Sequence, residues 1–225
     1  MKLTKDLNSY IDSSSIYSNY ITSSFNRYIK YSELPIRFLN DNINESRLPK
    51  KLKILYSNIY EIINNRYSYG ILVSDYVDVC NLCSLLLKKY FNDSIQNDTL
   101  LLNVLYIDTP LLLDDYKKLI DKDDLTSDSI THTIETLQTH ILTADMVFWD
   151  RFTLFSSNYD KQKIYNILST RYRADLANIF FVKGGKDVLN GMIDEDFAQA
   201  MNIASFIDCM SEKVKYKQVK ERTDD

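Results

Sequence analysis

The sequence predicts an α/β fold in which a parallel sheet is covered by helices on both faces. Short runs made almost entirely of apolar residues recur along the chain, and the stretches between them carry apolar residues at helical spacing. Strands of a sheet that is covered on both faces are apolar throughout, because neither face meets water, and parallel strands need a helix-length crossover between them. With 225 residues and 45% hydrophobic content, the chain is long enough for one such domain.

The part of the chain before Gly70 is expected to form an arm and one helix. Residues 1–34 alternate Ser, Tyr, Asn and Ile with too few apolar residues for a core. We interpret them as an N-terminal arm or loose helix, which is a candidate partner-binding element. From Leu48 to Asn64 the apolar residues recur every three or four positions, which predicts an amphipathic helix.

Four apolar runs after Gly70 predict four strands. These are residues 71–73, 101–107, 146–149 and 178–182. Helical spacing of the apolar residues between the runs predicts the crossovers. They are residues 82–91, 111–120, 130–142 and 160–173.

The end of the chain is predicted to be one helix over residues 195–210, followed by a charged tail. We therefore divide the chain into an arm, an α/β domain and a C-terminal segment. The three parts are residues 1–34, 35–193 and 194–225.

The positions of the glycines exclude a phosphate-binding loop. The chain has only four, at Gly70, Gly184, Gly185 and Gly191, and no two stand five apart as the GxxxxGK[ST] loop requires. The dinucleotide-binding GxGxxG motif is missing as well. The chain is therefore predicted to lack the loop that surrounds nucleotide phosphates.

Composition also indicates the compartment. Three cysteines, an odd number, and a start that does not look like a leader peptide favour a reducing compartment. The sequence has no apolar stretch long enough to span a membrane. A net charge of −4 does not by itself favour nucleic acid as a partner. We expect a cytoplasmic protein without membrane contact.

The order of these segments resembles the AAA+ helicase loaders of the DnaC/DnaI type, bacterial and phage proteins that place a replicative helicase on DNA. Residues 34–38 (LPIRF) stand where the loaders have a similar entry phrase, and residues 70–73 (GILV) match their first strand. Three further phrases follow in the family's order, the second of them in the Walker B position. They are residues 106–117 (YIDTPLLLDDYK), 144–151 (ADMVFWDR) and 164–172 (IYNILSTRY).

This sequence departs from the loaders where their nucleotide chemistry lies. In place of the phosphate loop, Asp75 and Asp78 stand at the start of a helix, where carboxylates repel a triphosphate. In the Walker B position Asp150 remains, but Arg151 replaces the second acid, and Lys183 lies where the family has a sensor. Phosphoryl transfer depends on positioning and charge neutralisation. The resemblance therefore implies a degenerate AAA+-like core without a P-loop, without ATPase activity, and with neither cofactor nor metal.

The most basic stretch, residues 161–186, is a candidate for DNA or partner contact. Basic side chains follow phosphates and aromatic ones stack on bases, and tyrosines interleave this stretch. Arg171 has a second candidate role, because an arginine of one AAA+ subunit can reach a neighbour's nucleotide. The candidates are Lys161, Lys163, Arg171, Arg173, Lys183 and Lys186.

Three other clusters favour plain structural roles. Cys80 and Cys83 form a CxxC pair, but zinc needs four ligands, and we expect two small core residues. His132 and His140 are expected to face solvent. The acidic stretch at residues 114–124 lacks the rhythm of a calcium loop and is expected to be a solvated surface.

The resemblance implies a non-catalytic accessory protein of DNA replication, which we expect to be phage-encoded and to act in the bacterial host cytoplasm. Its partners would be a replicative helicase or a loader protein, single-stranded DNA, and further copies of itself or of another subunit. One alternative is an inhibitor of loading or a clamp-loader-like non-catalytic subunit. Another is a metal-dependent nuclease that uses Asp150, because Asp75 and Asp108 also follow predicted strands.

Overall fold

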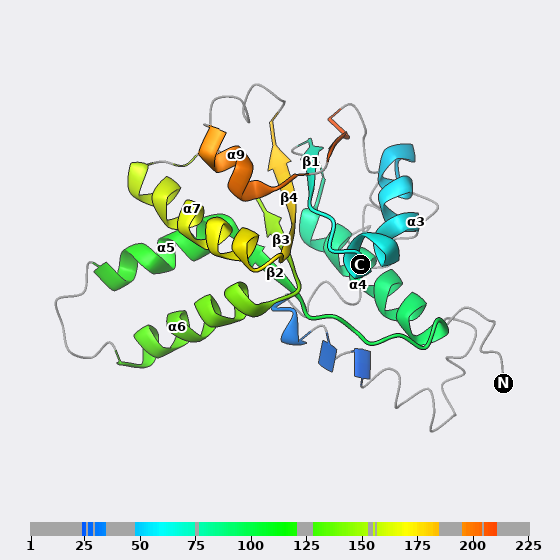
Figure 1. Cartoon of the computed structure of the whole chain (residues 1–225), viewed down its shortest axis with the longest axis horizontal. Coiled ribbons are helices and arrows are strands. Elements are labelled where there is room, and N and C mark those ends of the chain that lie inside the picture. Colours follow the sequence, from blue (N-terminus) through cyan, green and yellow to red (C-terminus); the bar gives the residue numbers. More distant parts are fainter. Residues whose placement is uncertain are drawn as a thin grey trace, which may run out of the picture.

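Five parallel strands form the centre of the structure, which is a computed structural model (Figure 1). They are β1 (Tyr69–Val73), β2 (Val104–Asp108), β3 (Met146–Asp150), β4 (Ala177–Lys183) and β5 (Ser205–Asp208). Their order across the sheet is β2-β3-β4-β1-β5. The structure describes residues 24–25, 27–28, 30–34, 48–74, 77–120, 128–152, 155, 157–184, 195–203 and 205–210.

Helices cover both faces of this sheet (Figure 1). One face carries α3 (Lys50–Asn64) and α4 (Val79–Gln96). The other carries α5 (Thr109–Ile120), α6 (Asp128–Thr143), α7 (Asn158–Arg173) and α9 (Glu195–Met201). The predicted fold class, a parallel sheet with helices on both faces, is confirmed. None of the described helices combines the length and apolar character needed to cross a bilayer.

Alternate strand residues pack into two separate cores. Ile71 and Phe148 belong to the core beneath α3 and α4, whereas Leu72 and Trp149 belong to the core on the opposite face. Trp149 has no exposed surface, and its strand lies between β2 and β4. The prediction that this tryptophan is buried in a central strand is confirmed. The continuous apolar runs arise because each strand must supply both cores.

The C-terminal segment differs from the prediction. α9 ends at Met201 and strand β5 follows, so the single helix predicted for residues 195–210 is wrong in its second half. β5 pairs with β1, where Phe206 lies opposite Gly70. A Cβ atom on Gly70 would lie 2.3 Å from the Phe206 ring, so glycine leaves the room that this pairing uses. The predicted charged tail lies outside the described residues.

The described end of the predicted arm contacts the core. Phe25 packs edge-on against Phe91 of α4, with ring centroids 5.2 Å apart, and Tyr28 lies 5.8 Å from the same ring. The backbone N–H of Tyr106 in β2 donates to the carbonyl of Ser32 at 2.8 Å. The expectation that the arm has too few apolar residues to join a core is wrong at Phe25, which packs against the core beneath α3 and α4.

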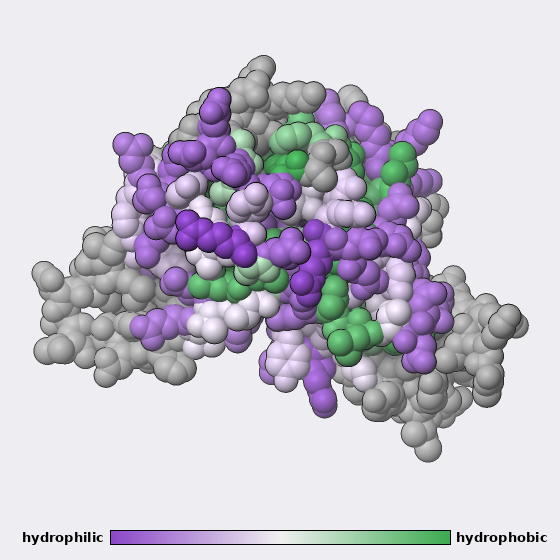
Figure 2. Space-filling model, viewed as in Figure 1, coloured by the Kyte–Doolittle hydropathy of each residue, from purple (hydrophilic) through white to green (hydrophobic). Residues whose placement is uncertain are grey.

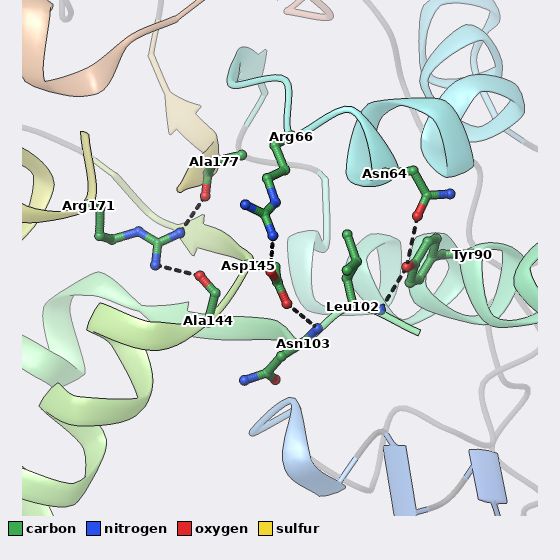
Figure 3. Close-up of polar contacts among 9 residues, drawn as sticks. All are labelled: Asn64, Arg66, Tyr90, Leu102, Asn103, Ala144, Asp145, Arg171 and Ala177. Carbon is green, nitrogen blue, oxygen red and sulfur yellow. Dashed lines mark hydrogen bonds and ion pairs between the residues drawn. The ribbon is translucent and has the colours of Figure 1, made fainter. Parts of the chain in front are cut away.

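Buried polar contacts connect the segments at the amino edge of the sheet, where the strands begin (Figure 3). The guanidinium of Arg171 donates to the backbone carbonyls of Ile141, Ala144 and Ala177. Its Nε donates to Oδ1 of Asn178 at 2.8 Å. These bonds join the end of α7 to the end of α6 and the start of β4, and they satisfy carbonyls that a helix end leaves open.

Asp145 makes a second set of contacts at the same edge (Figure 3). Its carboxylate pairs with Arg66 at 2.7 Å and accepts from the backbone N–H of Asn103 at 2.9 Å. The Tyr90 hydroxyl accepts from the N–H of Leu102 at 3.0 Å. The segments that precede β1, β2 and β3 are thereby tied together. We call this group the amino-edge network, and it comprises Arg66, Tyr90, Asn103, Asp145, Arg171 and Asn178.

Candidate functional site

A pocket of about 440 Å³ lies at the carboxyl edge of the sheet, where β2 and β3 end. Its walls come from both strand ends, from the first turn of α4, from α5 and α6, and from the end of the arm. Open α/β sheets bind their ligands outside the carboxyl ends of the strands. The lining residues are Glu33, Cys80, Tyr106, Ile107, Asp108, Leu111, Leu112, Asp115, Leu137, Asp150 and Arg151.

Asp150, the last residue of β3, faces this pocket from a buried position. It is 7% exposed. Its Oδ2 accepts a 2.6 Å hydrogen bond from the Tyr106 hydroxyl, whereas its Oδ1 has no hydrogen-bond partner. Burial raises the pKa of Asp150 above its ordinary value, although the hydrogen bond from Tyr106 acts in the opposite direction. The carboxylate that lines the pocket therefore has one buried oxygen, Oδ1, without a hydrogen-bond partner.

Arg151 neutralises the second carboxylate of the strand ends. Its backbone has a φ of 51°, a left-handed conformation that is uncommon for a residue other than glycine. Its guanidinium forms an ion pair with Asp108, which lies opposite Asp150 in the register of β2 and β3. The ends of β2 and β3 therefore carry two carboxylates and one cation, which pairs with Asp108.

The N-terminus of α4 is occupied by the protein's own carboxylate. Asp78 is the N-cap residue, and its side chain accepts hydrogen bonds from the backbone N–H of Asn81 at 3.1 Å and from the Asn81 amide at 2.9 Å. A helix N-terminus attracts anions through its open N–H groups and its dipole. Asp78 already satisfies part of that attraction. Asp75 lies outside the described residues.

The nuclease alternative needs several free acids at this edge. Asp108 and Asp150 do lie on neighbouring strands, but Asp108 is ion-paired with Arg151. Within the described part of the chain, no group of three or more His, Cys, Asp or Glu residues is placed to hold a metal ion. The described side chains therefore give this alternative no support.

The basic stretch does not form one surface. α7 begins after β3 and ends just before β4, so it runs from the carboxyl edge back to the amino edge. Lys161 and Lys163 lie near its start and Arg173 at its end, about 15–18 Å away at 1.5 Å per residue. Lys183 ends β4 at the carboxyl edge. Lys186 lies outside the described residues.

Arg171 is a correction to the predicted contact set. Its side chain has no exposed surface and donates to carbonyls inside the protein. Its guanidinium is therefore not on the surface, where DNA or a neighbouring subunit would bind. The sequence did carry the signal, because Arg171 lies four and three positions beyond the buried residues Ile167 and Leu168, on the apolar face of the helix.

The two lysines at the start of α7 lie over aromatic rings. The Lys163 ammonium is 4.7 Å from the centroid of Tyr116, and that of Lys161 is 5.9 Å from the centroid of Phe197. Both distances are in the range of cation–π contacts. Both lysine side chains are half-buried. They are therefore less accessible to an anionic partner such as DNA than the sequence predicts.

The remaining predicted clusters are structural where they are described. Cys80 and Cys83 are buried, and neither forms a disulfide with another described cysteine. Burial raises the pKa of Cys83 well above its ordinary value, which opposes thiolate chemistry. His140 is exposed, and the side chain of His132 lies outside the described set. Sequence reasoning missed Tyr106 and Glu33, although Tyr106 stands two residues before Asp108 and so on the same strand face.

Comparison with known proteins shows a shared fold at low sequence identity. No protein-family model and no curated protein sequence matches the chain. Among solved structures, the DnaC helicase loader matches with a TM-score of 0.56 and 16% identity over 77% of this chain and 99% of that one. The structure of DnaI matches with a TM-score of 0.55 and 14% identity over 78% and 94% of the two chains.

A replication initiator has the same arrangement. The AMPPCP-bound DnaA of Aquifex aeolicus matches with a TM-score of 0.52 and 14% identity over 78% of this chain and 51% of that chain. The structural neighbours are thus helicase loaders of the DnaC/DnaI type and DnaA, and they share with this chain the α/β sheet covered on both faces.

Proposed function

We propose that this protein is a non-catalytic accessory factor of DNA replication, which binds a replicative helicase or a loader protein without using ATP. The fold it shares with helicase loaders supports the replication role. The observation that supports ATP independence is Asp78 at the N-terminus of α4. A carboxylate stands there where a phosphate loop would bind phosphate, and the chain has no loop glycines or lysine beside it.

The replacement of the second Walker B acid supports the same proposal. Arg151 forms an ion pair with Asp108, so the strand ends offer no second carboxylate to position an attacking water. Catalysis of phosphoryl transfer rests on such positioning. In this proposal the protein is encoded by a phage and acts in the cytoplasm of the bacterial host. It works through surface contacts with its partner.

ATP binding tests the proposal directly. Titration with a fluorescent ATP analogue in the presence of magnesium is expected to give no saturable signal. The DnaC-type loader from a bacterium serves as the positive control under the same conditions. Saturable binding tighter than about 100 μM, which corresponds to about 5.5 kcal/mol, would contradict ATP independence.

A helicase-binding assay tests the partner. The purified replicative helicase of the host is mixed with the full chain and separated by size-exclusion chromatography, once with ATP and once without. We expect the same amount of complex in both cases. A helicase-loading assay on single-stranded DNA then separates a loader, which raises loading, from the alternative of an inhibitor, which lowers it. No complex in either condition would refute the helicase as partner.

A further inference from the structure

We propose that the carboxyl-edge pocket binds an organic cation, an ammonium or guanidinium group carried on an alkyl stem. This inference goes beyond the proposed replication role and does not depend on it. It rests on three features of the pocket, which are a buried carboxyl oxygen without a hydrogen-bond partner, an excess of acidic lining residues and an apolar wall.

The oxygen without a partner is Oδ1 of Asp150. The Asp150 side chain is more than nine-tenths buried, at 7% exposure. Its Oδ1 has no hydrogen-bond partner, whereas its Oδ2 accepts a hydrogen bond from the Tyr106 hydroxyl. A buried polar atom without a partner costs about 1–3 kcal/mol. A ligand that brings an N–H donor to this oxygen removes that cost, and a charged donor makes the stronger bond.

The charge of the lining selects a cation. Four acidic residues line the pocket, and Arg151 is the one basic residue among its described lining side chains. Arg151 is already paired with Asp108. Glu33 is exposed beside the pocket and adds negative charge where a ligand enters. A site of this sign raises the local concentration of cations and repels phosphates.

The apolar wall favours an alkyl stem over a metal ion. Ile107, Leu111, Leu112 and Leu137 line the same pocket as the carboxylates. Lysine, arginine and polyamines combine a charged head with methylene groups that pack on such a wall. A hydrated metal ion gains nothing from it, and the described residues contain no group of three potential metal ligands.

The same chemistry has two sources, a free polyamine or a basic side chain that a partner protein inserts. The experiment uses isothermal titration calorimetry of the full chain with 1,4-diaminobutane as the polyamine probe. The amides of N-acetyl-lysine and N-acetyl-arginine are the side-chain probes. We expect saturable binding of at least one of these cations. The neutral 1,4-butanediol, of the same length, is expected to show none.

Two pairs of variants locate the binding. Asp150→Asn is expected to weaken the cation at least tenfold, whereas Asp196→Asn, at an exposed acid of α9, leaves binding unchanged. Leu111→Lys puts a positive charge at the pocket from a residue that is 57% exposed, and it is expected to abolish binding, whereas Leu111→Gln retains most of it. Thermal unfolding verifies that each variant is folded.

The probe that binds more tightly identifies the source of the cation. Tighter binding of the diamine assigns the site to a polyamine, and tighter binding of an amino-acid amide assigns it to a partner's side chain. The proposal is overturned if no cation binds at about 10 mM, if Mg²⁺ competes the probe away at equal concentration, or if Asp150→Asn and Leu111→Lys bind like the unaltered chain. Such a failure would leave the ATP and helicase assays unaffected, because the proposed function rests on Asp78 and the fold.

Discussion

At the scale of single residues, Asp150 shows how a buried carboxyl links stability to pH. Burial raises its pKa in the folded protein, so between the ordinary value and the raised one the folded state binds more protons than the unfolded state. Stability contributed by this residue therefore falls as pH rises through that window. The groups that face it are Tyr106 and Asp108 of β2, Arg151, and the thiols of Cys80 and Cys83.

The first prediction concerns Asp150→Asn, which removes the buried charge while keeping the shape. We expect the variant to be more stable than the unaltered chain at neutral pH, by about 1–3 kcal/mol. The gain should shrink as pH falls and vanish once Asp150 is protonated in both states. Urea unfolding across a pH series measures it. A gain that grows toward acid pH would contradict the raised pKa.

Arg171 is the opposite case, because it is a buried charge whose three guanidinium nitrogens all donate hydrogen bonds. Burial lowers its pKa to about 9, which still leaves the guanidinium charged at neutral pH. Four acceptors surround it, namely three backbone carbonyls and the Asn178 side chain. Removing the arginine takes this donor from the three carbonyls, whereas Asn178 Oδ1 still accepts from the Trp149 indole N–H at 3.0 Å. The Arg171 side chain is therefore a structural element of the fold.

The second prediction follows for Arg171→Met. Each buried acceptor left unpaired costs about 1–3 kcal/mol, and we expect the free energy of unfolding to fall by about 3 kcal/mol or more. Arg173→Met is the matched control, because Arg173 lies on the same helix but is exposed. The control should change stability by less than about 0.5 kcal/mol. Chemical denaturation of both variants measures the difference. Equal effects of the two substitutions would refute the structural role of the buried Arg171 side chain.

At the scale of elements, the strands were easier to predict than their order. β1 to β4 lie where almost wholly apolar runs predicted them, because each must serve two cores. β5 was missed because its four residues, Ser205–Asp208, contain only two apolar side chains, and the strand pairs on one side only. The neighbours of each strand are set by contacts distant in sequence, which local patterns do not encode.

The third prediction concerns the end of the arm as a packing element. Phe25→Ala removes the edge-on contact with Phe91, and we expect a loss of about 1–3 kcal/mol from the buried area and the aromatic pair. Tyr31→Ala is the control, because Tyr31 is 69% exposed. Thermal unfolding of both variants compares them. An unaffected midpoint for Phe25→Ala would mean that the arm does not pack on α4 in solution.

At the scale of the whole molecule, charges close in sequence lie at opposite edges. The basic stretch was predicted as one surface, yet α7 carries Arg173 to the amino edge while Lys183 stays at the carboxyl edge. On the face drawn in Figure 2, hydrophilic residues cover most of the described surface and apolar ones form small separate groups. A crossover helix between two parallel strands runs opposite to the strands. Basic residues that continue from the helix into the next strand are therefore divided between the two edges of the sheet.

The fourth prediction uses this separation. If single-stranded DNA binds at the carboxyl edge, replacing Lys161, Lys163 and Lys183 together by Gln should lower the log–log salt slope by about two, at about 0.7 for each neutralised phosphate. Arg173→Gln should leave the slope unchanged. Fluorescence anisotropy with an oligonucleotide over a salt series measures both. A loss of slope with Arg173→Gln alone would place the DNA at the other edge.

The site was only partly predictable from the sequence. The positions of Asp78 and Asp150 followed from the strand pattern, because residues just after parallel strands meet at one edge. The pairing of Asp108 with Arg151, and the hydroxyl of Tyr106 on Asp150, required the register of β2 and β3. Arg171 was misassigned because charge was weighed above helical phase.

The amino-edge network separates what holds the molecule together from what gives it chemistry. Its bonds connect the starts of the strands, while the pocket and the N-terminus of α4 lie where strands end. Substitutions at the carboxyl edge therefore leave the bonds of the amino-edge network in place. The side chains that line the pocket and those that join the strand starts are therefore different residues, so the two edges can be altered separately.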